Sequence, residues 1–215
     1  MSSQVRGGTR WKRFALVMVP SIAATAAVGV GLAQGALAAS FSVSGQDFKV
    51  SADELVGQDL IQYGSVAEGA TLGSDAKSKH PVTISGFSSA KITNMCQSLV
   101  TPVPLLGTSI TLQLRTGNKG RSAEATNLYL DVAELDADAK FDQLDIGVAV
   151  GDKSNTTKPV PGTVMDNGLF AQRAKTATLT KVRQKAWATT AGTFTLPDLK
   201  LRLLSGDKPC YEDEK

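Results

Sequence analysis

The sequence predicts an all-β domain that follows an N-terminal hydrophobic segment. From residue 40 onward, short stretches such as ITLQL (110–114) and LYLDV (128–132) alternate apolar with polar residues, as strands with one buried face do. Clusters of Gly, Asn, Asp and Ser, such as TGNKGRS (116–122), separate these stretches and indicate turns. Helical periodicity is nearly absent, and only residues 51–60 and 165–174 are weak helix candidates.

A second pattern bears on the architecture. Two apolar residues enclose two other residues at positions 84–87, 141–144, 179–182 and 196–199. Such a bend between inward-pointing side chains suits the corner of a β-solenoid coil, and whole groups recur, as Leu179 and Val182 do at Leu196 and Leu199. We therefore expect a short, irregular β-solenoid-like domain, with an antiparallel β-sandwich as the alternative.

The first 38 residues have the composition of a signal peptide. Four basic residues precede a long apolar run over residues 14–39, and Ala36-Leu37-Ala38 fits the small-residue pattern of a cleavage site. The run is also long enough to span a bilayer, so a retained anchor is the alternative. We expect a signal peptide over residues 1–38 and a single extracytoplasmic domain over 39–215. The protein would then be secreted, or held at the membrane through the N-terminal segment if that segment is retained.

Removal of residues 1–38 changes the charge of the chain. The 23 Lys and Arg residues become 19 when Arg6, Arg10, Lys12 and Arg13 leave, against 20 Asp and Glu, which gives a net charge of −1. No basic patch for nucleic acid is indicated, so nucleic acid is not an expected partner. We expect no cofactor.

Cys96 and Cys210 are the two cysteines, and both lie in the predicted exported part. Outside the cytoplasm an even pair is expected to form a disulfide, which here would tie the C-terminal tail to the middle of the domain. Two separate thiols are the alternative. The loop closed by such a bond is long, and chain-entropy estimates give it about 4–5 kcal/mol of stabilisation.

A hydrolase would need a nucleophile and a base, and the stretch SKHPVTISGFSSA (78–90) offers both. His80 is the only histidine, and Ser88 or Ser109 would be the nucleophile. The order of His80 before Ser88 fails for an α/β-hydrolase, whose nucleophile precedes its histidine, and no glycine-rich oxyanion segment accompanies them. We expect His80 to lie on an exposed turn before the strand that begins near Val82.

The stretch DVAELDADAKFDQLD (131–145) is dense in carboxylates, and Asp131, Asp136 and Asp138 are the candidates for calcium. Their spacing lacks the central Gly and final Glu of an EF-hand loop. A solvated sheet face, with charges that discourage edge pairing, is the interpretation we favour over a metal site.

The stretch from Leu99 to Gly107 is apolar and broken by prolines, so it is expected as a loop or an edge strand. It either closes one end of the core or forms an exposed surface for lipid or membrane. The candidate contact residues are Leu99, Val100, Val103, Leu105 and Leu106, together with Trp187. Trp187 could stack on a ligand, although a core position is the expected one.

Three long strings carry a resemblance to a known family: WKRFALVMVPSIAATAAVGVGLAQGALAASFSVSGQDFKVSADEL, ITNMCQSLVTP and VRQKAWATTAGTFTLPDLKLRL, the last followed by a late Cys-Tyr. The chain resembles a family of exported actinobacterial proteins of unknown function that genome records often label "cholesterol esterase". The resemblance implies a role in the cell envelope and a small multi-pass membrane protein as partner. It brings no catalytic residues to carry over.

These observations favour a non-enzymatic envelope protein that binds an apolar or lipid ligand or a membrane-protein partner. A lipid-ester hydrolase, acting on carboxylic or steryl esters, is the alternative. A structural surface protein that acts by self-association is the second alternative.

Overall fold

The structure is a computed structural model. It describes residues 18, 45–70, 77–103, 107–160 and 166–213. The chain divides into two compact units, Met1–Ala39 and Ser40–Lys215. The predicted signal or anchor segment, apart from Met18, lies outside the described residues. Within the described ranges, no helix is long and apolar enough to cross a membrane.

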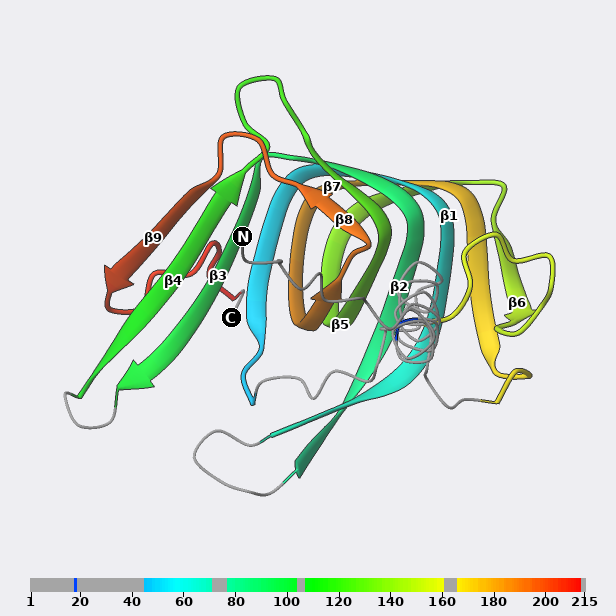
Figure 1. The fold of residues 1–215 in the computed structure, drawn as a ribbon, viewed down its shortest axis with the longest axis horizontal. Helices are drawn as coiled ribbons and strands as arrows, with labels where there is room; N and C mark the ends of the chain where they lie inside the picture. Colours follow the sequence, from blue (N-terminus) through cyan, green and yellow to red (C-terminus); the bar gives the residue numbers. More distant parts are fainter. Residues whose placement is uncertain (1–17, 19–44, 71–76, 104–106, 161–165, 214–215) are drawn as a thin grey trace, which may run out of the picture. The chain divides into compact units, whose positions relative to one another are not determined.

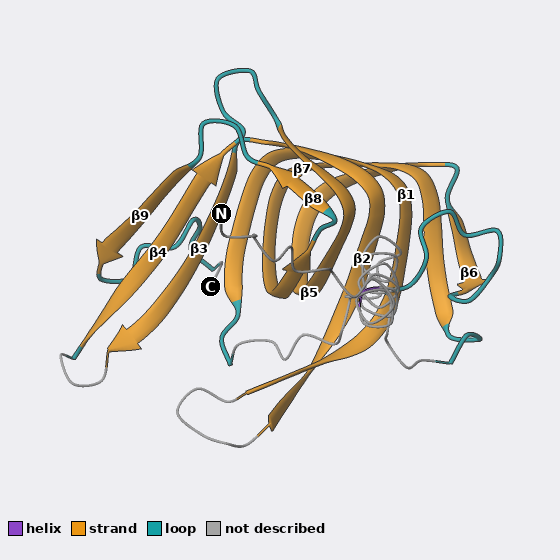
Figure 2. Cartoon of the chain, viewed as in Figure 1, coloured by secondary structure: helices purple, strands orange, loops and turns teal. Residues whose placement is uncertain are grey.

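Strands dominate the second unit, which confirms the all-β prediction (Figure 2). The described residues form nine: β1 (Phe48–Ala70), β2 (Lys77–Thr93), β3 (Met95–Val103), β4 (Thr108–Thr116), β5 (Ala123–Asp142), β6 (Asp145–Ala149), β7 (Phe170–Thr190), β8 (Thr193–Thr195) and β9 (Lys200–Ser205). The two weak helix candidates were wrong, because residues 51–60 lie inside β1 and residues 170–174 begin β7. Pairing on both edges of β1 outweighs the local helical propensity there.

Four long strands, β1, β2, β5 and β7, close into a small antiparallel barrel, which we call the ring (Figure 1). β1 pairs with β2, β2 with β5, β5 with β7, and β7 again with β1. The solenoid expectation therefore fails, since neighbouring strands run antiparallel around a closed sheet instead of stacking as coils. The sandwich alternative fails as well, because one sheet curls onto itself. Strands of 17 to 23 residues are long enough to curve around so few neighbours.

The bends of these strands are made by residues in the left-handed conformation. Asp59 in β1, Asn127 in β5 and Lys181 in β7 have φ values of 50°, 47° and 52°. Gln143 and Asp198, in the turns before β6 and β9, have φ values of 54° and 52°. Three of these positions, 143, 181 and 198, lie within the apolar pairs that suggested solenoid corners. The sequence pattern thus located a bend of β7 and the turns before β6 and β9, none of which is the corner of a solenoid coil.

The larger core cluster draws residues from all four ring strands: Val50, Ala52, Leu55, Leu60, Phe87, Ala90, Ile92, Met95, Ala123, Ala125, Leu128, Leu130, Val132, Ala174, Ala177, Leu179 and Val182. Phe87 is its largest fully buried side chain. Gly57 makes room for that ring, because a Cβ at position 57 would lie 2.2 Å from the Phe87 side chain. The described side chains of the ring interior are therefore closely packed.

A second apolar cluster includes Tyr63, Tyr129 and Val150, and the loop 150–160 lies across it. The Tyr129 hydroxyl donates to the Lys158 carbonyl at 2.9 Å, and the Val160 amide donates to the Tyr63 hydroxyl at 3.0 Å. Burial raises the pKa of Tyr63 to about 12. The loop is thus fixed to the ring by two buried phenols.

Strands β3, β4 and β9 extend the sheet away from the ring, and we call them the wing (Figure 1). β2 and β3 pair with β1 in one continuous register, from Glu54↔Thr93 to Ser51↔Cys96. Asn94, with a φ of 51°, separates the two strands. Beyond Ser98, β3 pairs with β4 alone, so residues 99–103 form an edge on the other side. This agrees with the second of the two forms predicted for the proline-containing stretch, a loop or an edge strand.

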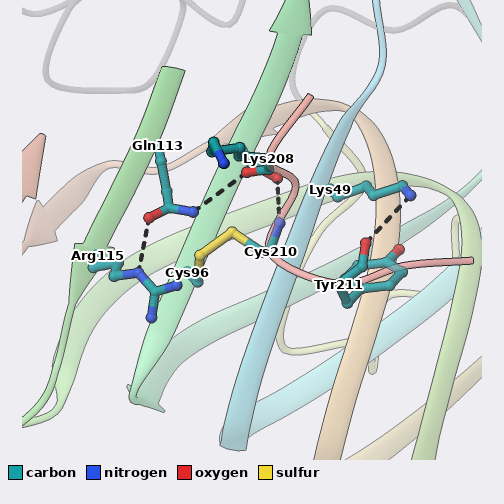
Figure 3. The surroundings of a disulfide bond; sticks show 8 residues. Lys49, Cys96, Gln113, Arg115, Lys208, Cys210 and Tyr211 are labelled. Carbon is teal, nitrogen blue, oxygen red and sulfur yellow. Dashed lines mark hydrogen bonds between the residues drawn. A yellow bond between two sulfur atoms is a disulfide. The ribbon is translucent and has the colours of Figure 1, made fainter. Parts of the chain in front are cut away.

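The predicted disulfide is present and ties the C-terminal tail to the wing (Figure 3). Cys96 and Cys210 are bonded, with their Cα atoms 5.8 Å apart. The Cys210 amide donates to the Ser98 hydroxyl at 2.9 Å. Further along, Lys49 donates to the Tyr211 carbonyl at 3.4 Å and its ammonium lies 5.0 Å from the Tyr211 ring centre. The tail therefore connects β3 with the first residues of β1.

Candidate functional site

The two faces of the wing differ in chemistry. Residues directly opposite each other on paired strands point to the same side of a sheet, and side chains alternate along each strand. Leu99, Leu112 and Leu203 form one row across β3, β4 and β9, and Leu114 and Leu201 lie in the next row. We call this side the leucine face, and its members are Leu99, Val103, Ile110, Leu112, Leu114, Leu201 and Leu203.

Part of the leucine face is exposed to solvent. Leu112 is 39% exposed, Leu201 61% and Leu203 70%, while Leu199, just before β9, is 50% exposed. Leu114, nearer the ring, packs against the larger core cluster. The face thus runs from the core outward into solvent. Contiguous exposed apolar surface of this kind is a candidate interaction site.

The opposite face of the wing is polar and is covered by the tail. The Thr111 side chain, 0% exposed, donates to the Gly206 carbonyl at 2.7 Å and accepts from the Lys208 amide at 3.0 Å. Gln113 donates to the Lys208 carbonyl at 3.4 Å (Figure 3). The tail satisfies these groups, so the part of this face around Thr111 and Gln113 belongs to the folded interior, whereas Lys200 and Arg202 on the same face are exposed.

The wing also carries an uneven charge. Its three strands contain Arg115, Lys200 and Arg202 but no Asp or Glu, which gives +3. The predicted exported chain, 39–215, has a net charge of −1, so the remainder carries −4. Arg115 and Lys200 lie directly opposite each other on β4 and β9, and like charges in that position repel. An anion at this edge would relieve the repulsion.

The chain enters the ring beside the wing. Residues 49–51 of β1 pair with residues 96–98 of β3. Just before them, Gln46 accepts a hydrogen bond from the Thr101 hydroxyl at 3.1 Å. Thr101 is on the side of β3 that carries Leu99 and Val103. The described part of the second unit therefore begins next to the leucine face.

The predicted lipid-contact residues fall into three groups. Leu99 and Val103 lie on the leucine face, whereas Val100 points to the opposite side, across from the buried Thr111. Leu105 and Leu106 lie outside the described residues. Sequence reasoning missed the leucines of β4 and β9, because alternation in ITLQL predicts a half-buried strand and the alternation in KLRLL was not considered. The signal that could have found them is the Lys-Leu-Arg-Leu pattern of β9 itself.

The three hydrolase candidates occupy different places. Ser88 donates to the Asp59 carboxylate at 2.8 Å, in the middle of β2. His80, eight residues earlier in the same strand, contacts the Ser78 hydroxyl through Nε2 at 2.9 Å. Ser109 lies in β4, on the wing. The structure gives His80 no hydrogen bond to Ser88 or Ser109.

His80 and Trp187 are brought together. Their rings stack with centres 3.6 Å apart and planes 13° from parallel. His80 was expected on an exposed turn, but it lies inside β2 and is half-buried. Trp187 packs against the second apolar cluster. The indole face nearest His80 is thus already occupied by a side chain of the protein.

The carboxylates predicted as metal candidates lie on β5. Asp138 forms an ion pair with Lys181 at 2.9 Å, Asp136 is exposed, and Asp131 is half-buried. Within the part of the chain that the structure describes, no three His, Cys, Asp or Glu side chains come together where they could hold a metal ion.

The fold and this surface define an all-β protein, tied by a disulfide, with a closed ring and an exposed apolar face on its wing. The chain belongs to the family of unknown function DUF6230, whose model matches residues 44–211. No curated protein and no solved structure matches the chain significantly.

Proposed function

We propose that this protein is an extracytoplasmic envelope protein that acts by binding, and that its leucine face binds the surface of a membrane containing anionic lipids. The exposed row of leucines on β4 and β9 is the observation that carries the proposal. The disulfide supports an oxidising compartment outside the cytoplasm.

The chemistry of the wing favours a lipid surface. Leu201 and Leu203 can enter the boundary between headgroups and acyl chains, where burial of a leucine side chain contributes roughly 1.5–3 kcal/mol. Lys200 and Arg202 project from the opposite face of β9, but β9 is the end strand of the described sheet, so their flexible side chains can extend around it to phosphate groups. Each such cation near an anionic membrane contributes about 1 kcal/mol.

Vesicle flotation tests this proposal with matched variants. The exported protein is mixed with vesicles of phosphatidylglycerol and phosphatidylcholine, and the fraction that floats is measured. The double variant Leu201→Gln/Leu203→Gln is expected to bind at least tenfold more weakly, because it removes more than about 1.4 kcal/mol of the free energy gained when the leucine side chains leave water. The two side chains are mostly exposed, so the fold is expected to remain intact.

Ile146→Gln is the control, because Ile146 on β6 is 65% exposed and lies outside the wing. Its binding should equal that of the parent. Equal flotation of the double variant and the parent contradicts the proposal. If the parent does not float but forms a dimer that the double variant lacks, the leucine face serves self-association.

A further inference from the structure

A polar cleft lies between β1, β7 and the residues on either side of β6. Its volume is about 250 Å³. It is lined by residues of β1, β7, the turn before β6 and the loop after β6: Asp59, Leu60, Ile61, Gln143, Leu144, Asp145, Ser154, Asn155, Thr156, Thr157, Arg173, Ala174 and Lys175. The volume is slightly below the roughly 300–1,000 Å³ of pockets for drug-sized ligands, so the cleft suits one small molecule.

The charges of the cleft are balanced in pairs. Arg173 donates through Nε to Asp145 at 2.9 Å, and Lys175 donates to Asp59 at 2.5 Å. The hydrogen bond from Lys175 lowers the pKa of Asp59, which keeps that carboxylate ionised. With two cations and two anions already paired, an ionic ligand would have one like charge beside it for every opposite charge. The arrangement therefore favours a neutral ligand.

The lining side chains are held in place from behind. Asp59 is in the left-handed conformation, its carbonyl accepts from Thr157 at 2.5 Å, and its second carboxylate oxygen accepts from Ser88. Asn155, 3% exposed, donates to the Val150 carbonyl at 2.9 Å and accepts from Arg173 at 3.2 Å. Such fixed polar groups lose little conformational entropy when a ligand binds.

Several groups at the mouth of the cleft can form further hydrogen bonds to a ligand. Among the hydrogen bonds of the described residues, Asp145 uses one carboxylate oxygen, Arg173 uses Nε and Nη1, and Lys175 uses one of its three N–H bonds. The Thr156 side chain is exposed. The cleft thus presents donors and acceptors side by side. A sugar hydroxyl both donates and accepts, and hydrogen bonds to ionised partners are stronger than those between neutral groups.

We propose that this cleft is a binding site for a single neutral sugar unit, with Lys175, Arg173 and Asp145 as its principal contacts. The site is separate from the leucine face, and it would allow the protein to bind a glycan while its wing binds lipid. Its existence does not depend on the membrane proposal.

NMR titration of the exported full chain tests the site. The probes are methyl α-D-glucopyranoside, methyl α-D-mannopyranoside and methyl β-D-galactopyranoside, with inorganic phosphate and glycine as ionic competitors. At least one glycoside is expected to shift the amide signals of residues 154–157 saturably, with a millimolar dissociation constant. Phosphate and glycine should cause no saturable shift there.

Two variants and a control complete the experiment. Lys175→Gln is expected to weaken glycoside binding at least threefold, and Thr156→Val should weaken it without affecting the fold, because that side chain is exposed. Lys181→Gln is the control, since Lys181 is another exposed lysine of β7 that pairs with an aspartate. The inference is overturned if no glycoside gives saturable shifts, if an ionic competitor binds instead, or if both cleft variants bind like the control.

Discussion

Asp131 illustrates how a single residue works against the stability of the fold. Its neighbours across the strands are Ile84 on β2 and Ala188 on β7, both members or neighbours of the second apolar cluster. Tyr63 lies close enough for the Asp131 charge to raise the phenol pKa further. Burial raises the pKa of Asp131, because the charged carboxylate is partly removed from water.

Asp131→Asn is therefore expected to stabilise the protein at neutral pH. Since the folded-state pKa is raised, the folded protein binds this proton more tightly than the unfolded chain, and stability falls as the pH rises through the raised value. The gain from the amide should be largest at pH 7 and should vanish below about pH 4. Urea unfolding of both proteins at the two pH values measures it. A gain independent of pH would show that the carboxylate charge is not the cause.

Three residues in the ring strands adopt the left-handed conformation, and Lys181 is the one that is neither Asp nor Asn. Lysine has no special tolerance for the left-handed region, whereas the short polar side chains of Asp59 and Asn127 do. The ion pair of Lys181 with Asp138 is exposed and contributes little.

Lys181→Asn is expected to raise the free energy of unfolding by about 0.5–1 kcal/mol, since asparagine relieves the backbone strain. Lys140→Asn on β5 is the control: it is also exposed and paired with an aspartate, but its φ is not positive. That change should lower stability slightly, because asparagine is a poor strand residue. Denaturant unfolding compares the two, and equal effects would rule out strain at position 181.

At the scale of elements, the wing depends on the tail to cover part of its polar face. The buried Thr111 and Gln113 have their partners in residues 206–208, and Cys210 fixes that segment to β3. If the tail dissociated from the wing, the polar groups of Thr111 and Gln113 would need hydrogen bonds from water, and the polar face of the wing would lose its cover.

The double variant Cys96→Ala/Cys210→Ala is expected to lose about 2–5 kcal/mol of stability. Hydrogen exchange should show the loss first in the amides of β3, β4 and β9, while those of β1, β2, β5 and β7 keep more of their protection. Uniform loss of protection over both groups would mean that ring and wing unfold as one unit.

The elements also show what a sequence can and cannot predict here. Alternation located β4 and the first half of β5, the cysteine pair predicted the disulfide, and residues 99–103, in a stretch predicted as a loop or an edge strand, form an edge. The sequence pattern could not predict which strands pair with each other, because period-two alternation is the same in a solenoid, a sandwich and a ring. The leucine face was missed for a similar reason: alternation says that one face of a strand is apolar, but only the sheet shows that the apolar side of β9 is exposed.

At the scale of the whole molecule, the ring and the wing differ in what they contribute: the ring supplies the larger core and the wing supplies an exposed apolar surface. The ring strands pair with each other on both edges and bury the larger core. The wing carries the exposed leucines and the unbalanced positive charge, and the polar cleft lies against β1 and β7. A stable centre thus supports two surfaces of opposite chemistry, one apolar and one polar.

The joint between ring and wing has a mechanical consequence. The Asn94 backbone amide donates to the Gly117 carbonyl at 2.7 Å. A Cβ on Gly117 would lie 2.7 Å from the Ile92 carbonyl oxygen, so only glycine fits there. Through this joint β2 continues as β3, and β1 pairs with both in one register. A force on the leucines therefore travels along continuous backbone into the ring. Any change in the direction of the wing would therefore have to alter the backbone at Asn94 and the pairing of β1 with β3 together.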